Sequence, residues 1–232
     1  MKSVLLLCSI VFAYSQSTEN VLKNIWSFTG GKSAFEKARY ISFDWIVAKD
    51  GTPVKVNHHT WDRYTGDYVL SYTSKEKKKI ETYFNVNSKK GFTLIDGTHS
   101  EDSKYIDEAY ESFINDSYWL IVPTKLEDKG VHLSYSKEKE LDILTMSFEN
   151  VGLTPKDVYK LYVTAKGKIV KWTFTLENGR KGEFDWDDYQ TVGLGIKFSL
   201  NKISKTSPFA IRFENVILSE TIDRSVFKYT QN

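Results

Sequence analysis

The sequence predicts an α+β protein that is mainly β: an antiparallel incomplete (half) β-barrel of about 11–12 strands, with helices covering its concave apolar face. Two observations predict this fold. Between residues 40 and 219, most segments alternate apolar and polar side chains with a period of two, and tight turns separate them. One segment, residues 98–131, keeps a helical period instead. A chain of 232 residues suits one undivided domain of this kind.

The segment from Thr98 to Val131 contains the helix that we expect to cover the sheet. Thr98 and Glu101 fit a capping box that would begin it. Pro123 would end it, because the proline ring removes a backbone donor. We therefore expect an amphipathic helix over residues 102–119 that ends in the apolar run 118–122. The residues on its apolar face are Ile106, Ala109, Tyr110, Phe113 and Ile114.

The remaining segments follow from their periods and turns. Residues 19–28 and 32–39 are expected to form short helices. We expect strands at residues 40–48, 53–63, 67–73, 80–87, 91–96, 131–136, 141–149, 159–165, 169–177, 182–189, 194–200 and 210–219. Residues 154–157 could start one further helical turn.

Residues 1–15 have the pattern of a secretory signal peptide. Lys2 is its positive end, residues 4–12 its apolar region, and residues 13–15 a small-x-small site before Gln16. The apolar run is too short to span a bilayer. A leucine precedes Cys8, where a lipoprotein site requires a small residue. We therefore expect residues 16–232 to be a single mature domain, secreted to the periplasm and not a lipoprotein.

The composition disfavours several classes of partner and chemistry. The chain has 32 basic and 30 acidic residues, and removing the signal would remove only Lys2, which leaves 31 and 30. This balance gives no general attraction to nucleic acid or to an anionic membrane. Cys8 is the single cysteine and lies in the predicted signal, so the mature chain would have no disulfide. We expect a monomer with no transmembrane segment.

No motif for a serine hydrolase, a phosphate-binding loop, a dinucleotide fold or a zinc protease occurs in the sequence. His58 and His59 are adjacent on a predicted strand, so they would point to opposite faces and could not bind one metal. We therefore expect no catalytic residue, no metal site and no cofactor.

Six short motifs follow one another along the chain. They are Gly30-Gly31 through Phe35, Ile41 to Phe43, His59 to Asp62, Tyr118 to Leu126, Trp186 to Leu194, and Asp223 to Phe227. Their order resembles the outer-membrane lipoprotein-sorting (LolA/LolB-like) half-barrels, and most of all a secreted branch of that fold with no assigned function. The resemblance implies an incomplete antiparallel barrel with helices as a lid over an apolar cavity. It also implies binding and transfer of acyl chains without chemistry.

The candidate site is the apolar concave face with the helix over it. An open cavity there could hold an acyl chain, because each buried methylene is worth about 0.8 kcal/mol. If the same side chains fill the interior, they form a closed core instead, and the sequence leaves both possibilities open. The aromatic residues that could line the cavity are Phe43, Trp45, Tyr110, Phe113, Trp119, Trp172, Phe174 and Trp186.

We therefore expect a non-enzymatic binding or carrier protein for a lipid, an acyl chain or another hydrophobic ligand. Two alternatives remain. Asp185 and Asp187 share the polar face of a strand beside Trp186, an arrangement that could bind or cleave glycans. In the second alternative the helix plugs the barrel, and the protein docks a periplasmic or outer-membrane protein partner.

Overall fold

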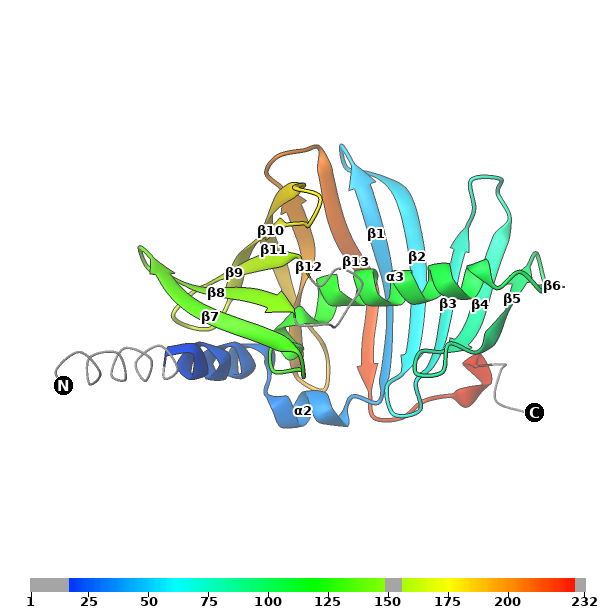
Figure 1. Cartoon of the computed structure of the whole chain (residues 1–232). Helices are drawn as coiled ribbons and strands as arrows, with labels where there is room; N and C mark the ends of the chain where they lie inside the picture. The colour runs from blue at the N-terminus through cyan, green and yellow to red at the C-terminus, as the bar shows by residue number, and fades with distance from the viewer. Residues whose placement is uncertain (1–16, 149–155, 228–232) are drawn as a thin grey trace, which may run out of the picture.

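The computed structural model describes residues 17–148 and 156–227 (Figure 1). The predicted signal peptide and the first two residues of the predicted turn at 154–157 lie outside these residues. Within them, all strands belong to one 13-stranded antiparallel sheet that does not close. The predicted fold class is confirmed, with a thirteenth strand that the sequence patterns did not indicate.

The strands follow the predicted segments closely. They are β1 (Tyr40–Lys49), β2 (Thr52–Asp62), β3 (Asp67–Thr73), β4 (Lys79–Asn85), β5 (Gly91–Ile95), β6 (Thr98–Ser100), β7 (Val131–Glu138), β8 (Leu141–Phe148), β9 (Val158–Val163), β10 (Ile169–Thr175), β11 (Lys181–Gly193), β12 (Ile196–Ser204) and β13 (Phe209–Ser219). The helical elements are residues 17–29, α2 (Lys32–Lys37), α3 (Lys104–Ile121), and the 3-10 turns η1 (Val122–Thr124) and η2 (Arg224–Val226).

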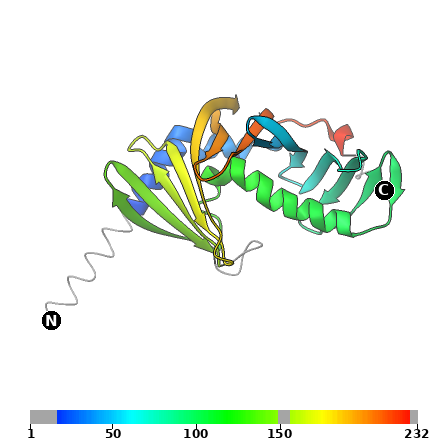
Figure 2. The ribbon, with the colours of Figure 1, turned by 90° about the horizontal axis from the view of Figure 1, so that it is seen from above.

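The order of the strands explains the long helix. The sheet runs β6-β5-β4-β3-β2-β1-β13-β12-β11-β10-β9-β8-β7, so the chain starts in the middle and proceeds to one edge. It must then cross to the opposite edge before β7 begins. Helix α3 makes this crossing with 18 residues, a length of about 27 Å at the usual rise. Figure 2 shows α3 lying in the hollow of the curved sheet.

The predicted helix start is wrong. Thr98 and Glu101 form no capping box, because Thr98–Ser100 pairs with β5 as the short strand β6. Asp96 and Gly97 have φ angles of 50° and 81° and form the turn between these strands. The helix begins at Lys104 instead, after Ser103. Three residues are too few for an alternating pattern to reveal a strand.

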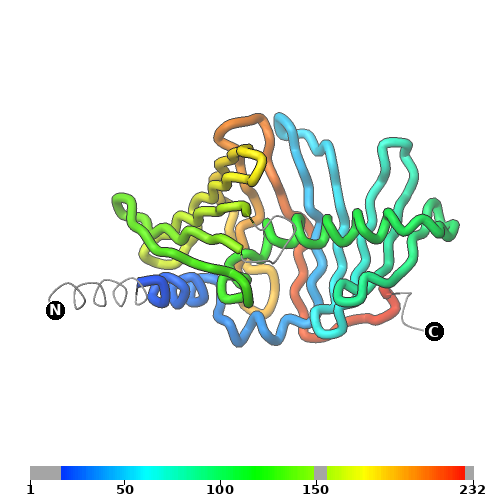
Figure 3. The backbone as a smooth tube through the Cα atoms, in the orientation of Figure 1, coloured from blue at the N-terminus to red at the C-terminus, as the bar shows by residue number. Residues whose placement is uncertain are grey.

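Only one of the predicted helices covers the concave face of the sheet. Helix α3 covers the concave face as expected, whereas the two N-terminal helical segments lie along one end of the strands (Figure 3). Their apolar side chains still reach the interior. The rings of Phe35 and Phe198 are 6.4 Å apart, and Val21 and Ile25 are buried with the strands β8 to β10.

The interior consists of two clusters of buried side chains. One lies around Phe43, Leu70 and Phe198, and the other around Leu144, Leu161 and Trp172. Among the described residues, no helix is long and apolar enough to cross a membrane.

Candidate functional site: a groove beside helix α3

The eight aromatic residues predicted to line a cavity are all inside or beside the core. Phe43, Trp45, Trp172 and Trp186 are buried, and Tyr110, Phe113, Trp119 and Phe174 are half-buried. The structure brings one subset together as a stack. The ring of Trp119 on α3 lies 5.2 Å from that of Trp172, which in turn lies 5.4 Å from that of Trp186. This stack joins α3 to the second cluster.

Phe43 and Trp45 belong to the other cluster, together with the half-buried Tyr110 and Phe113 of α3. Phe43 stacks on the imidazole of His59, with ring centres 4.6 Å apart. The predicted aromatic residues thus form two packed groups, and they do not face a single common space.

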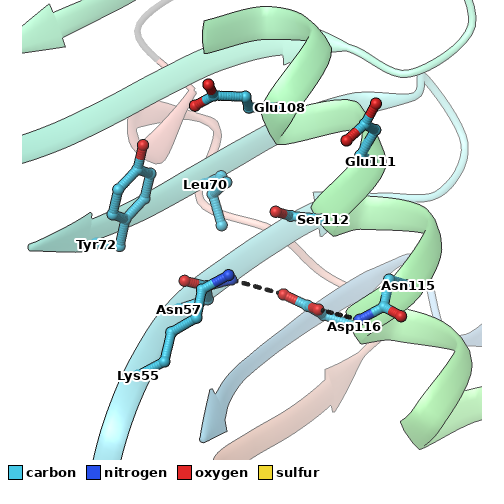
Figure 4. Close-up of a pocket in the computed structure, with 9 residues that line it drawn as sticks. All are labelled: Lys55, Asn57, Leu70, Tyr72, Glu108, Glu111, Ser112, Asn115 and Asp116. Carbon is cyan, nitrogen blue, oxygen red and sulfur yellow. Dashed lines mark hydrogen bonds between the residues drawn. The ribbon is translucent and has the colours of Figure 1, made fainter. Parts of the chain in front are cut away.

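Two pockets lie beside α3, nearer its N-terminus than Trp119 and above β2 to β5. The central pocket has a volume of about 350 Å³ and includes Asn57, Leu70, Ser112 and Asp116 in its lining (Figure 4). The edge pocket has a volume of about 380 Å³ and includes Ile80, Ile95 and Tyr105. Both share Tyr72 and Glu108, so we describe them together as the α3 groove.

The floor of the α3 groove is apolar and its rim is charged. Leu70 and Ile80 are buried at 1% and 2% exposure, with Ile95 and Tyr72 half-buried beside them. The charged rim residues are Lys55, Glu76, Lys78, Lys104, Glu108 and Glu111. Both volumes lie in the range of small-molecule sites, which is about 300–1,000 Å³.

A buried polar network closes the inner end of the groove. The Asp116 carboxylate on α3 accepts a hydrogen bond from Asn57 Nδ2 on β2 at 2.7 Å. Its Oδ2 also lies 3.1 Å from Nε2 of His59, and its Oδ1 accepts from Asn115 Nδ2 at 2.7 Å. Nδ1 of His59 is 2.6 Å from the Tyr68 hydroxyl. This network attaches the middle of α3 to β2 and β3.

The surroundings of the Tyr68 hydroxyl keep it protonated. Burial and, secondarily, the nearby Asp116 charge raise the pKa of Tyr68 well above its ordinary value. The phenol is therefore neutral at physiological pH and can donate its proton to His59. With Asp116 accepting from Nε2–H and Tyr68 donating to Nδ1, a neutral imidazole satisfies both contacts.

This network was not among the residues predicted from the sequence, although the sequence contains two signals for it. Asp116 falls three residues after Phe113 and seven after Ala109, so a carboxylate occupies the apolar face of the helix. Asn57 and His59 are two residues apart on one strand and therefore share its inner face. A buried charge on an apolar face requires hydrogen-bond partners. Asn57 and His59 are the partners of Asp116.

The prediction that His58 and His59 point to opposite faces of their strand is confirmed. His59 is buried, whereas the side chain of His58 is 54% exposed and its Nδ1 contacts Asp44 Oδ1 at 2.5 Å on the outer face. Among the described residues, no three histidine, cysteine, aspartate or glutamate side chains gather where they could hold a metal ion.

The aspartates of the glycan alternative lie apart from their aromatic neighbour. Trp186 points into the core with 3% exposure. Asp185 faces outward and pairs with Lys205 at 2.8 Å, and Asp187 is exposed on the same strand. A sugar bound at these carboxylates would therefore have no access to the Trp186 ring.

No family model matches the chain, and no curated protein matches it. Among solved structures, the chain is similar to the crystal structure of a DUF1329 family protein from Desulfovibrio piger. The TM-score is 0.49 with 8% sequence identity, and the match covers 84% of this chain and 96% of that one. The resemblance to lipoprotein-sorting half-barrels stays a prediction from the sequence motifs.

Proposed function

We propose that the protein is a secreted, periplasmic, non-enzymatic binding or carrier protein for an acyl chain or another hydrophobic ligand. The observation that carries the proposal is the α3 groove, which combines an apolar floor with a charged rim beside the helix that covers the concave face. This combination suits an amphipathic molecule, whose chain needs burial while its head group stays hydrated.

Burial of the chain would supply most of the affinity. Leu70, Tyr72, Ile80 and Ile95 form an apolar surface along the two adjacent pockets. Each methylene buried on this surface contributes about 0.8 kcal/mol, from which the cost of ordering the ligand is subtracted. A chain of ordinary fatty-acid length is therefore enough for a stable complex.

In this proposal α3 acts as the lid. Its ends are joined to the sheet through loops, and its middle is attached through Asp116. The half-buried faces of Tyr110, Phe113 and Trp119 would become available to a longer ligand if the helix moved outward. The predicted aromatic residues then extend the groove inward, beneath the lid.

The first experiment is native mass spectrometry of the mature protein from its own periplasm, followed by organic extraction of any bound molecule. The proposal predicts a discrete adduct that extracts as a lipid, and uptake of an added fluorescent fatty acid. A bare mass with no uptake would contradict it and would favour a plugged barrel that docks a protein partner.

A pair of matched variants locates the site. Ser112 lies on α3 and lines the central pocket, so Ser112→Trp would fill much of its volume of about 350 Å³. Asp107 is exposed in the first turn of the same helix, so Asp107→Trp adds the same ring outside the groove. We expect Ser112→Trp to weaken uptake by about tenfold or more and Asp107→Trp to leave it unchanged. Equal effects would place the ligand elsewhere.

A further inference from the structure

The floor of the central pocket contains a hydrogen-bond acceptor without a partner. Asn57 is 1% exposed, and its Oδ1 has no hydrogen-bond partner among the described residues. Its Nδ2 donates to Asp116, 2.7 Å away. The opposite amide orientation would place the Asn57 oxygen against a carboxylate oxygen, which cannot donate. The contact with Asp116 therefore identifies Oδ1 as the atom without a partner.

Figure 4 shows the consequence for the pocket. The nitrogen of Asn57 is turned toward Asp116, and its oxygen is turned away from it, toward the side of the pocket that holds Tyr72. Buried carbonyl oxygens are normally paired. A ligand group that satisfies this oxygen must be a donor, which means an N–H or an O–H.

The charges around the pocket favour a cation as that donor. Glu108 and Glu111 lie on the exposed side of α3 along its rim, and Asp116 lies at its inner end. The single basic side chain of the lining is Lys55, whose Nζ lies 5.4 Å from the centre of the Trp45 ring. The lining of the central pocket therefore carries three carboxylates and one ammonium group, which is an excess of negative charge.

Tyr72 adds a neutral aromatic surface between the two pockets. Burial and the nearby charge of Glu108 raise the pKa of Tyr72 above its ordinary value. Its ring therefore stays uncharged at neutral pH and can contact both an ammonium group and an alkyl chain.

From the free acceptor and the surrounding carboxylates we infer that the α3 groove binds amphiphiles with a primary ammonium head group. The head donates to Asn57 Oδ1 in the central pocket and lies between Glu108 and Glu111. The alkyl chain runs past Tyr72 into the edge pocket, over Ile80 and Ile95. This inference rests on the proposed function and adds the head-group class to it.

The test compares three ligands with the same twelve-carbon chain: dodecylamine, dodecyltrimethylammonium and dodecanoate. Each competes at neutral pH against a bound fluorescent fatty acid on the full mature chain. We expect dodecylamine to bind about tenfold more tightly than dodecanoate, because the ammonium can donate to Asn57 Oδ1 whereas a carboxylate cannot and is repelled by Glu108 and Glu111. Dodecyltrimethylammonium should fall between them, since it keeps the charge but has no N–H for Asn57.

Variants of the rim glutamates test whether their charges, and not a change in the fold, determine the affinity for the amine. Glu108→Gln and Glu111→Gln remove exposed charges, and each should weaken dodecylamine several-fold while leaving dodecanoate no weaker. Asp107→Asn is the matched control, with the same loss of charge on the same helix outside the groove, and should change neither ligand. Equal binding of amine and carboxylate, or equal effects of the three variants, would overturn the inference and leave the carrier function standing. Binding of none of the three ligands would instead overturn the proposed function.

Discussion

His59 on β2 and Asp116 on α3 are 57 residues apart in the chain, yet Nε2 of the first lies 3.1 Å from Oδ2 of the second. Both side chains are buried, at 1% and 2% exposure. Asn57 donates to the same oxygen. A helix that otherwise covers the sheet through apolar contacts is thus held in register by one carboxylate.

Asp116→Ala should destabilise the protein by about 3 kcal/mol, because it leaves His59 and Asn57 buried without their acceptor. Asp116→Asn should cost less, since an amide still offers one oxygen. Urea unfolding of each variant gives the change in the free energy of unfolding.

Asp107→Ala is the control, because this residue is exposed on the same helix and should change stability by no more than about 0.5 kcal/mol. If Asp116→Ala were as mild as this control, the network would not hold the helix.

Asp62 should produce part of the acid sensitivity of the fold. Burial acts to raise its pKa, but hydrogen bonds from Arg39 and from the backbone of Tyr64 and Thr65 outweigh burial and lower the pKa below the ordinary 3.8. A carboxyl with a depressed folded pKa stabilises the protein above its unfolded pKa, and this stability is lost as the pH falls through the folded value.

The free energy of unfolding, measured from neutral pH down through the carboxyl range, should therefore decline in the native protein as Asp62 is protonated. Asp62→Asn should be less stable at neutral pH and should show a shallower decline. Parallel curves for the two proteins would show that Asp62 has the same pKa folded and unfolded.

Lys202→Met should stabilise the protein. Lys202 is fully buried, with Nζ 4.7 Å from the Trp186 ring centre and 4.4 Å from that of Phe213. Burial lowers the pKa of Lys202 well below 10.5, against a smaller opposing effect of Asp188. Methionine has a similar length and no amine to desolvate, so we expect a gain of about 1 kcal/mol at neutral pH.

The pH dependence gives an independent check. Between the lowered folded pKa and 10.5 the unfolded chain binds more protons at Lys202 than the folded chain does, so native stability should rise with pH there. Lys202→Met should lose this rise. An unchanged slope would mean that Lys202 is charged when folded.

Gly167→Ala should weaken the docking of the N-terminal helix. A Cβ at Gly167 would lie 2.0 Å from the backbone oxygen of Asn24, and Asn24 Nδ2 donates to the carbonyl of Ala165 in the same turn. Gly179→Ala is a matched control, because Gly179 has the same φ of 82° and no atom within 4 Å of the added carbon.

Both variants share the backbone strain, so their difference measures the contact. We expect Gly167→Ala to be about 2 kcal/mol less stable than Gly179→Ala in urea unfolding. Equal stability would show that residues 17–29 do not depend on this turn.

Local patterns were sufficient for most elements. The alternation in β1 places Ile41, Phe43 and Trp45 inside, as predicted, and the apolar spacing of α3 places Ala109 inside with Asp107 and Glu111 outside. The exception is β6, where three residues are too short to show a period. Its signal was the Asp96-Gly97 turn, which favours a hairpin more strongly than Thr98 favours a helix cap.

The candidate site was harder to predict, because inward-facing aromatic residues line a cavity or fill a core with the same sequence pattern. Trp172 stacks on both Trp119 and Trp186, so these rings contribute packing, while the groove lies beside an earlier part of α3. Which side chains touch across the sheet depends on the position of the helix, and no local pattern contains that position.

The amino-acid sequence by itself determined the periods, the turns and the single long helix, since each depends on residues within a few positions of one another. Only the tertiary structure decided that β13 lies beside β1, that α3 must cross from β6 to β7, and that Asn57, His59 and Asp116 meet beneath it. These relationships join residues far apart in the chain. They arise from backbone pairing and burial of the whole sheet at once, which short-range spacing does not specify.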